Sequence, residues 1–258
     1  MATSYSDNRH TSSAALLARQ ILQQVKCELL LTARRGENVL ITLIVPVVLL
    51  IFFTSLNLVP KTGESTINFL LPGILALAII AAGMVNLGIS TAYERYYGVL
   101  KRLGSSPLPR SGLIIAKVIS ILILEMLQVI LLVGEAIVLY GWRPVGSPLL
   151  ALLTIALGTV TFASLGLAMA GALRAEITLA GANALYLVFL LIGGSLLPVD
   201  RLPAPLADFA QMLPAAALTQ ALQATMNNGE RFPATPMIVL AVWAVAILLI
   251  AVRTFKWE

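Results

Sequence analysis

Four charged side chains lie close together in the stretch YERYYGVLKRLGSSPLPR, residues 93–110, and they are well placed to make specific contacts. Drawn as a helix over 93–103, the stretch puts its tyrosine, valine and leucine side chains on one side and its charges on the other. The glycine, two serines and proline that follow predict an abrupt end to this helix. The charged residues of 93–103 are Glu94, Arg95, Lys101 and Arg102, and Arg110 ends the stretch.

Two interpretations of this charged helix are open. A charged helix face can make orienting contacts with a soluble protein. Alternatively, Lys and Arg at the inner surface of a membrane fix topology, and tyrosines are common at that interface. The second interpretation explains the basic residues, but it requires neither a sharply terminated helix nor the acidic Glu94. We therefore predict that 93–103 is a helix that docks on a soluble partner.

A second group of polar residues interrupts the long apolar run 111–140. At 100° per residue Lys117, Gln128 and Glu135 share one side of a helix, and Glu125 lies roughly 80° away. A carboxylate in hydrocarbon costs at least about 2.5–3.5 kcal/mol, so these side chains should face protein or water. They could contact a translocated substrate, carry a proton, or simply hydrogen-bond neighbouring helices; the sequence leaves these alternatives open.

Residues for catalysis or metal binding are scarce in the chain. It contains one histidine, His10, and one cysteine, Cys27, so neither a His/Cys metal site nor an internal disulfide can form. The phosphate-binding pattern GxxxxGK[ST] and the zinc-protease pattern HExxH are both absent. We predict that the chain is not an enzyme and holds no cofactor or metal of its own.

The composition places the chain in a membrane. Of its 258 residues, 59% are hydrophobic and 11% are charged, and the mean hydropathy is +0.94, whereas a soluble domain is about 25% charged. Runs of about 20 apolar residues are long enough to cross the bilayer as helices. Six spans are predicted, near 38–59, 67–92, 111–140, 149–172, 178–197 and 234–252.

The distribution of basic residues predicts the orientation of these spans. If the N-terminus is inside, 13 of the 17 Lys and Arg residues lie in inside segments. Such an excess is typical of cytoplasmic loops, so both termini are predicted to be cytoplasmic in a multi-pass protein of a bacterial-type inner or plasma membrane. The net charge of +5 therefore reflects topology and does not call for nucleic acid.

Two further segments are predicted to be helical without spanning. Residues 14–35 form an amphipathic helix of interfacial type, although Glu28 falls off the pattern; packing on a partner protein is the alternative. The apolar stretches 205–213 and 214–226 are each too short to span, and the prolines around them suggest a re-entrant helical hairpin or else an external loop. Residues 1–13 are predicted to be a disordered tail before a single domain, 14–258.

The stretch 93–110 resembles the cytoplasmic motif of ABC-2 type (type V) exporter permeases, which reads like E-R-E-x-G-T-L-K-R-L followed by P-L-P and a basic residue. Glu94-Arg95, Gly98, Leu100 to Leu103 and Pro107 to Arg110 match, whereas Tyr96 replaces an acidic residue and Val99 a threonine. Six spans, an N-terminal amphipathic helix, a hairpin between spans five and six and a short aromatic and basic tail agree with the same family.

The resemblance implies a role and partners. The chain would form half of a transmembrane pathway, pair with a second permease subunit (the same chain or a paralogue), and work with separate ATP-binding cassette subunits that carry ATP and Mg. The helix 93–103 would be the coupling helix, with Glu94, Arg95, Gly98, Lys101 and Arg102 as its contact residues. The low aromatic content, 7%, favours a drug-like amphiphile or lipid over a polysaccharide or glycoconjugate. A six-span channel or secondary carrier unrelated to ABC proteins is the remaining alternative.

Overall fold

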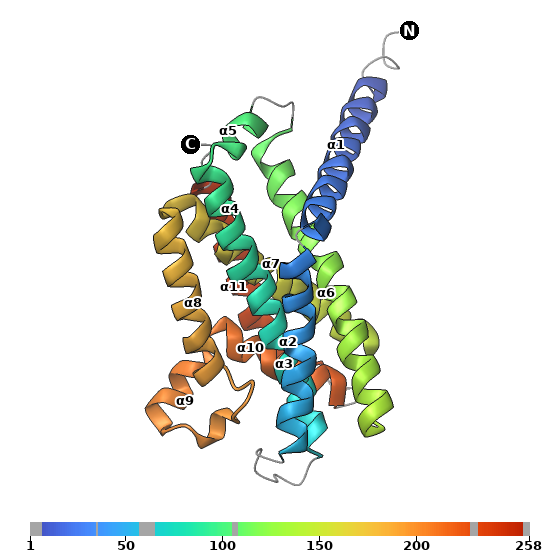
Figure 1. The fold of residues 1–258 in the computed structure, drawn as a ribbon, viewed down its shortest axis with the longest axis vertical. Helices are drawn as coiled ribbons and strands as arrows, with labels where there is room; N and C mark the ends of the chain where they lie inside the picture. Colours follow the sequence, from blue (N-terminus) through green and yellow to red (C-terminus); the bar gives the residue numbers. More distant parts are fainter. Residues whose placement is uncertain (1–6, 35, 57–64, 105–107, 228–231, 255–258) are drawn as a thin grey trace.

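The computed structural model describes residues 7–34, 36–56, 65–104, 108–227 and 232–254, and within these ranges every regular element is a helix. Figure 1 labels these elements along the chain. Their bounds are α1 Asp7–Arg34, α2 Gly36–Ser55, α3 Thr66–Ile80, the π-helix η1 Ala81–Asn86, α4 Leu87–Tyr96, α5 Val99–Gly104, α6 Arg110–Tyr140, α7 Pro148–Ala172, α8 Ala175–Ile192, the 3-10 helix η2 Val199–Arg201, α9 Ala204–Gln211, α10 Pro214–Asn227 and α11 Ala234–Thr254.

The long apolar helices agree with a polytopic membrane protein. In the part of the chain that the structure describes, five continuous helices are long and apolar enough to span: 66–96, α6, α7, α8 and α11. The bent pair α1 and α2 brings the number to six if it is counted as one further span. Five of the predicted spans therefore match these helices in position, although their ends differ. The first, 38–59, falls on α2 of the bent pair, and its residues 57–59 lie outside the described residues.

The fifth predicted span is the one most shortened. Helix α8 ends at Ile192, not at residue 197. Gly193 follows as its C-cap, and Gly194 takes a left-handed conformation with φ of 74°. Glycine adopts this backbone region without steric cost, so the pair ends the helix even though the leucines that follow would continue an apolar run.

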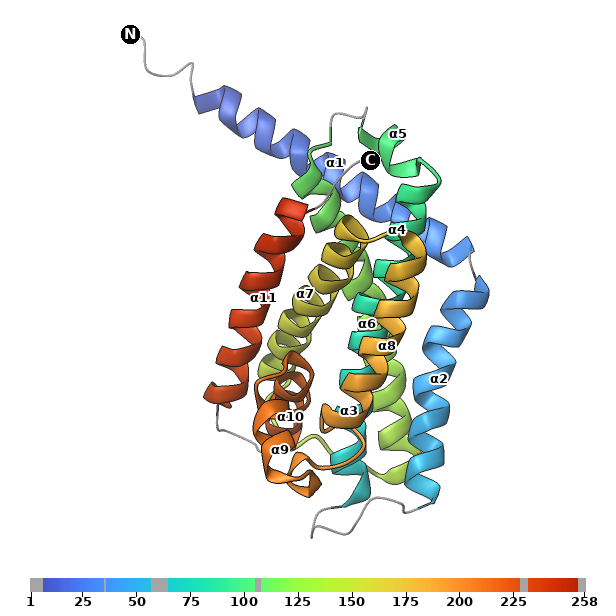
Figure 2. The same cartoon turned by 90° about the vertical axis from the view of Figure 1, so that its left-hand side faces the viewer.

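Helix α1 is longer than the amphipathic helix predicted at 14–35. It begins at Asp7, so it includes residues 7–13, which the sequence assigned to a disordered tail. Residues 1–6 of that tail lie outside the described residues. The helix packs mainly against α6 rather than standing apart from the bundle, and Figure 2 shows it crossing the end of the bundle at a steep angle.

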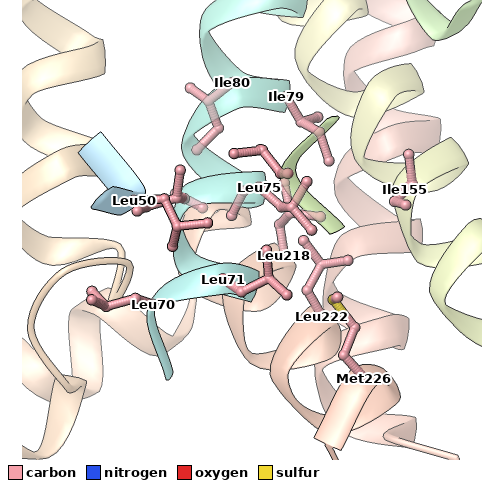
Figure 3. Close-up of a cluster of buried hydrophobic side chains, with 14 of the residues drawn as sticks. Leu50, Leu70, Leu71, Leu75, Ile79, Ile80, Ile155, Leu218, Leu222 and Met226 are labelled. Carbon is pink, nitrogen blue, oxygen red and sulfur yellow. The ribbon is translucent and has the colours of Figure 1, made fainter. Parts of the chain in front are cut away.

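The core is built around α3 and its continuation through η1 into α4. Every residue of α3 from Leu70 to Ile80 is buried, which explains why this segment is apolar on all sides. Figure 3 shows side chains of α2, α3, α7 and α10 meeting in the main hydrophobic cluster. The central helix therefore connects two ends of the molecule through a close-packed interior.

Helix α10 is the buried half of the segment predicted to form a hairpin. It begins at Pro214 and packs against α3, α7 and α11, with almost its whole first two turns buried. Its carboxyl end is held by two polar contacts, because Asn227 Nδ2 donates to the Asn68 carbonyl at 2.7 Å and the Gly146 amide donates to the Met226 carbonyl at 3.0 Å. In contrast, α9 is mostly exposed and apolar. Protein thus covers the α10 backbone, as a re-entrant segment requires.

Candidate functional site

The predicted helix over 93–103 is wrong as a single element. The helix that starts at Thr66 continues to Tyr96, and α5 begins only at Val99. Between them Gly98 has a φ of 71°, in the left-handed region that glycine adopts most readily. The helical periodicity of 93–103 did not reveal this break, because two short helical segments separated by a turn can still match one helical wheel. The helix α5 does end at Gly104, but residues 105–107 lie outside the described residues.

The break also changes where the aromatic side chains lie. Tyr96 is 64% exposed and Tyr97 is 70% exposed, so they do not pack beneath the spans as one apolar face. Leu100 alone of the α5 residues is fully buried, and it anchors the short helix on a second hydrophobic cluster. Lys101 and Arg102 lie on the exposed side of α5. The predicted two-sided character therefore holds for α5 but not for the tyrosines.

Glu94 turns into the protein and meets Lys117 of α6. The Lys117 Nζ lies 2.8 Å from Glu94 Oε2 and 3.1 Å from Glu28 Oε1 of α1. The lysine side chain is 1% exposed, and the two glutamates are 16% and 13% exposed. One ammonium therefore joins three helices, α1, α4 and α6, that are far apart in sequence. We call Glu28, Lys117 and Glu94 the charge triad.

Two members of the charge triad gave weak signals in the sequence. Lys117 stood out as a cation in an apolar span, and Glu28 as the residue that broke the amphipathic pattern of 14–35. Neither signal named a partner, because the contact depends on how α1 crosses α6. Burial of all three charges is compensated by mutual pairing, which is the arrangement that buried ionic groups require.

Arg95 also makes its contacts within the chain. Its guanidinium donates to the Gly171 carbonyl at 2.5 Å and to the Leu173 carbonyl, at the end of α7. The last carbonyls of a helix have no intrahelical partner, and a cation there is favoured by the helix dipole. Arg95 therefore ties the end of α4 to the end of α7, rather than projecting its charge toward a soluble partner.

We expect Arg95→Ala to reduce stability more than Arg95→Lys does. Alanine leaves both α7 carbonyls without their donor, at a cost of about 1–3 kcal/mol, while lysine keeps a single charged donor in reach. The apparent melting temperature of the purified protein in detergent is the measurement. Arg174→Ala, which removes an exposed arginine next to the same turn, serves as the control. Equal melting temperatures for the Arg95 and Arg174 variants would contradict the capping role.

The intramembrane polar residues predicted in 111–140 contact neighbouring helices. Glu125 is 1% exposed and accepts a hydrogen bond from the Thr159 hydroxyl of α7, while its second oxygen has no partner among the described residues. Gln128 is 3% exposed and donates to the Thr42 carbonyl of α2 at 2.7 Å. These contacts favour the helix-packing interpretation, in which α6 is held against a neighbour on each side.

Glu135 differs from the other two residues. It is half-buried near the far end of α6, and neither carboxylate oxygen has a hydrogen-bond partner among the described residues. The structure therefore does not join Glu135 to Glu125 and Gln128 in one site. A role for any of the three in contacting a translocated substrate stays a prediction.

A cavity of about 500 Å³ lies next to the charge triad, between α1, α2, α4 and α6. Asn86, the last residue of the π-helix η1, lines it and donates to the Thr42 hydroxyl at 3.1 Å. Single-turn π-helices inside α-helices occur frequently at functional sites. This cavity could not be predicted from the sequence, because its lining residues are spread between Glu28 and Gln128.

These features define a polytopic helical membrane protein with a short helix, α5, that carries two exposed basic residues at one end of the bundle. Figures 1 and 2 place α5, α1 and the carboxyl end of α11 at that end, with α9 at the other. The family model described as ABC-2 type transporter matches residues 19–227, so the chain belongs to the ABC-2 type transporter family. The resemblance seen in residues 93–110 is thereby confirmed.

Similar proteins agree with this family assignment. The chain is 23% identical over 191 residues to the probable multidrug ABC transporter permease YbhS of Escherichia coli strain K12. The same protein from Escherichia coli O157:H7 gives the same identity over the same length. The match covers 73% of this chain and 51% of the relative, so the chain spans about half the length of the curated relatives it matches.

Proposed function

We propose that this chain is the permease subunit of an ATP-driven exporter that moves a drug-like amphiphile or a lipid across a membrane. It would form half of the pathway, with a second permease subunit as its partner and separate ATP-binding cassette subunits supplying the energy. Both termini and α5 would face the cytoplasm, and α9 and α10 would form the re-entrant hairpin in the outer leaflet. Membership of the ABC-2 family supports this role, and the relative described as a probable multidrug permease supports the substrate class.

The observation that carries the proposal is the connection between α5 and the charge triad. The basic pair Lys101 and Arg102 is exposed on α5, and Leu100 anchors α5 on the bundle. Gly98 joins α5 to α4, whose last turn carries Glu94. A push on α5 would therefore be passed through Glu94 and Lys117 to α1 and α6. This arrangement revises the coupling residues, because Glu94 and Arg95 transmit motion within the permease while Lys101 and Arg102 contact the ATPase.

We expect the double variant Lys101→Glu/Arg102→Glu to lose coupling while still folding. Both side chains are exposed, so their reversal leaves the core intact, whereas reversed charges at a docking surface repel the partner. The measurement is substrate-stimulated ATP hydrolysis by the permease reconstituted with its cognate ATPase. We expect a fall of at least about tenfold, since an interfacial charge pair can be worth 2–5 kcal/mol.

The control for this experiment is Arg174→Glu, which reverses an exposed charge at the start of α8, where a carboxylate is favoured by the helix dipole. It should keep full coupling. If the α5 double variant instead inserts in the wrong orientation, α5 is a topological anchor and not a docking element. Failure of the wild-type chain to bind any ATPase, with transport that survives ATP depletion, would favour a channel or secondary carrier and overturn the proposal.

A further inference from the structure

We propose that the cavity between α1, α2, α4 and α6 is a binding site for a hydrophobic organic cation. Its volume of about 500 Å³ lies within the range of small-molecule pockets, which is about 300–1,000 Å³. Half of its 20 lining residues are aliphatic, among them Leu31, Ile89 and Leu124. Aliphatic side chains of this kind bind the carbon skeleton of a drug-sized molecule, while the polar ones orient it.

The charge of the cavity selects the sign of its occupant. Glu28 and Glu94 both line it, while none of the described lining residues is a lysine or arginine. Lys117 pairs with both carboxylates but does not line the cavity. Its single positive charge therefore compensates one of the two negative charges. The charge triad therefore presents one net negative charge to the cavity. A monovalent cation restores neutrality there, whereas an anion adds to the repulsion.

The aromatic side chains at the same end favour the same occupant. The rings of Tyr93 and Tyr97 both line the cavity and are stacked, with centroids 6.1 Å apart and an angle of 24° between their planes. Tyr97 is 70% exposed, so its ring lies at the open end of the cavity. Tyrosine faces attract cations through the ring quadrupole. The two rings and the two carboxylates therefore form one cation-binding end of the cavity.

The opposite part of the wall supplies hydrogen-bonding groups. The Thr42 hydroxyl and carbonyl already accept hydrogen bonds from Asn86 and Gln128, so this part of the cavity is held by fixed polar contacts between α2, η1 and α6. A rigid wall of this kind orients a bound molecule with its apolar part along α2 and α6. The site lies beside the charge triad, so an occupant would contact the same glutamates that connect α1 to α4.

This assignment rests on the proposed function in one respect, which is that the bound cation is the transported substrate. Binding of the cation to the cavity requires no ATPase and can be tested separately. The experiment measures equilibrium binding of tetraphenylphosphonium to the permease in nanodiscs of zwitterionic phosphatidylcholine. Tetraphenylborate is the matched probe, because it has the same shape and the opposite charge. We expect saturable binding of tetraphenylphosphonium at one site per chain, and at least about tenfold weaker binding of tetraphenylborate.

Three variants locate the binding. Glu28→Gln keeps the Glu94–Lys117 pair but removes the net negative charge, so it should weaken tetraphenylphosphonium binding about tenfold and abolish the preference over tetraphenylborate. Tyr97→Leu changes an exposed side chain outside the core. It should weaken the binding of tetraphenylphosphonium by a few-fold and leave the binding of tetraphenylborate unchanged. Ser90→Trp, which fills the cavity, should abolish binding of both probes. Glu176→Gln, an exposed carboxylate of α8 outside the cavity, should change nothing.

Each outcome decides the assignment. The assignment is overturned if the two probes bind with equal affinity, or if cation binding survives Ser90→Trp. It is also overturned if wild-type nanodiscs bind neither probe, a result that would indicate a cavity occupied by lipid chains. If Glu28→Gln fails to fold, Tyr97→Leu and Ser90→Trp still test the site. A further result would be that tetraphenylphosphonium binds as expected without stimulating ATP hydrolysis by the reconstituted complex and without being transported. That result would support the binding site but would show that the cation is not the transported substrate. If the wild-type permease shows no coupling to ATP hydrolysis with any substrate, the proposed function fails, whether or not the cation binds.

Discussion

Lys117→Met is expected to prevent the permease from reaching its folded state at normal temperature. Methionine has nearly the length of lysine but no charge, so Glu28 and Glu94 would face each other without the ammonium that now lies 3.1 and 2.8 Å from them. Removing one partner of a buried ion pair costs about 3–5 kcal/mol. Here two carboxylates lose their partner at once, so we expect a value at the upper end of that range.

The measurement for this prediction is the fraction of protein that elutes as a single species from size exclusion in mild detergent, together with its melting temperature. The triple variant Glu28→Gln/Glu94→Gln/Lys117→Met removes all three charges and should recover most of the lost stability, since neutral groups carry no uncompensated charge. It should nevertheless lack ATPase coupling, because the link between α1, α4 and α6 is gone. If Lys117→Met alone is as stable as the wild type, the charge triad contributes nothing to the fold.

Gly166→Leu is the second change for which we expect complete loss of folded protein. A Cβ atom on Gly166 of α7 would lie 2.7 Å from the carbonyl oxygens of both Gly83 and Met84. These are backbone atoms of η1, so no side chain can rotate aside. On the other helix, a Cβ on Gly88 would lie 2.9 Å from the Gly166 Cα. The two helices approach with their backbones in contact, as small residues allow in membrane proteins.

The series Gly166→Ala and Gly166→Leu should show a graded effect. Overpacking costs about 1–3 kcal/mol for a small addition and more for a large one, so alanine should lower the melting temperature and leucine should abolish folding. Gly134→Ala is the matched control, because nothing lies within 4 Å of a Cβ at that position in α6. That change should be neutral or stabilising, by up to about 1 kcal/mol. A fully folded Gly166→Leu variant would show that α4 and α7 can separate.

The membrane spans could be predicted from the sequence, because the lipid bilayer imposes strict requirements on any segment that crosses it. A span must satisfy its backbone internally and present apolar side chains to lipid, so the long runs and their approximate positions follow from hydropathy alone. The break at Pro214 between the two short helices followed from proline chemistry in the same way.

The parts that could not be predicted depend on contacts between distant segments. Arg95 is in a basic motif in either interpretation, but only the packing of α4 on α7 shows that it caps a helix end. The Gly98 turn was obscured because glycine inside a helical pattern costs only about 1 kcal/mol, and the periodicity on both sides was good. The π-helix left no local signature, since its sequence AAGMVN also fits the interior of an apolar α-helical span.

The charge triad also constrains the order in which the protein can be assembled during synthesis. Glu28 and Glu94 are both made before Lys117, and α1 packs mainly against α6, which follows α1, α2 and the helix 66–96 along the chain. A nascent chain that ends before α6 therefore holds two glutamates with no cation to meet them, and its first helix has no docking surface. The charge triad can therefore form only after α6 has been synthesised, and the packing of α1 against the bundle depends on a helix that is made later.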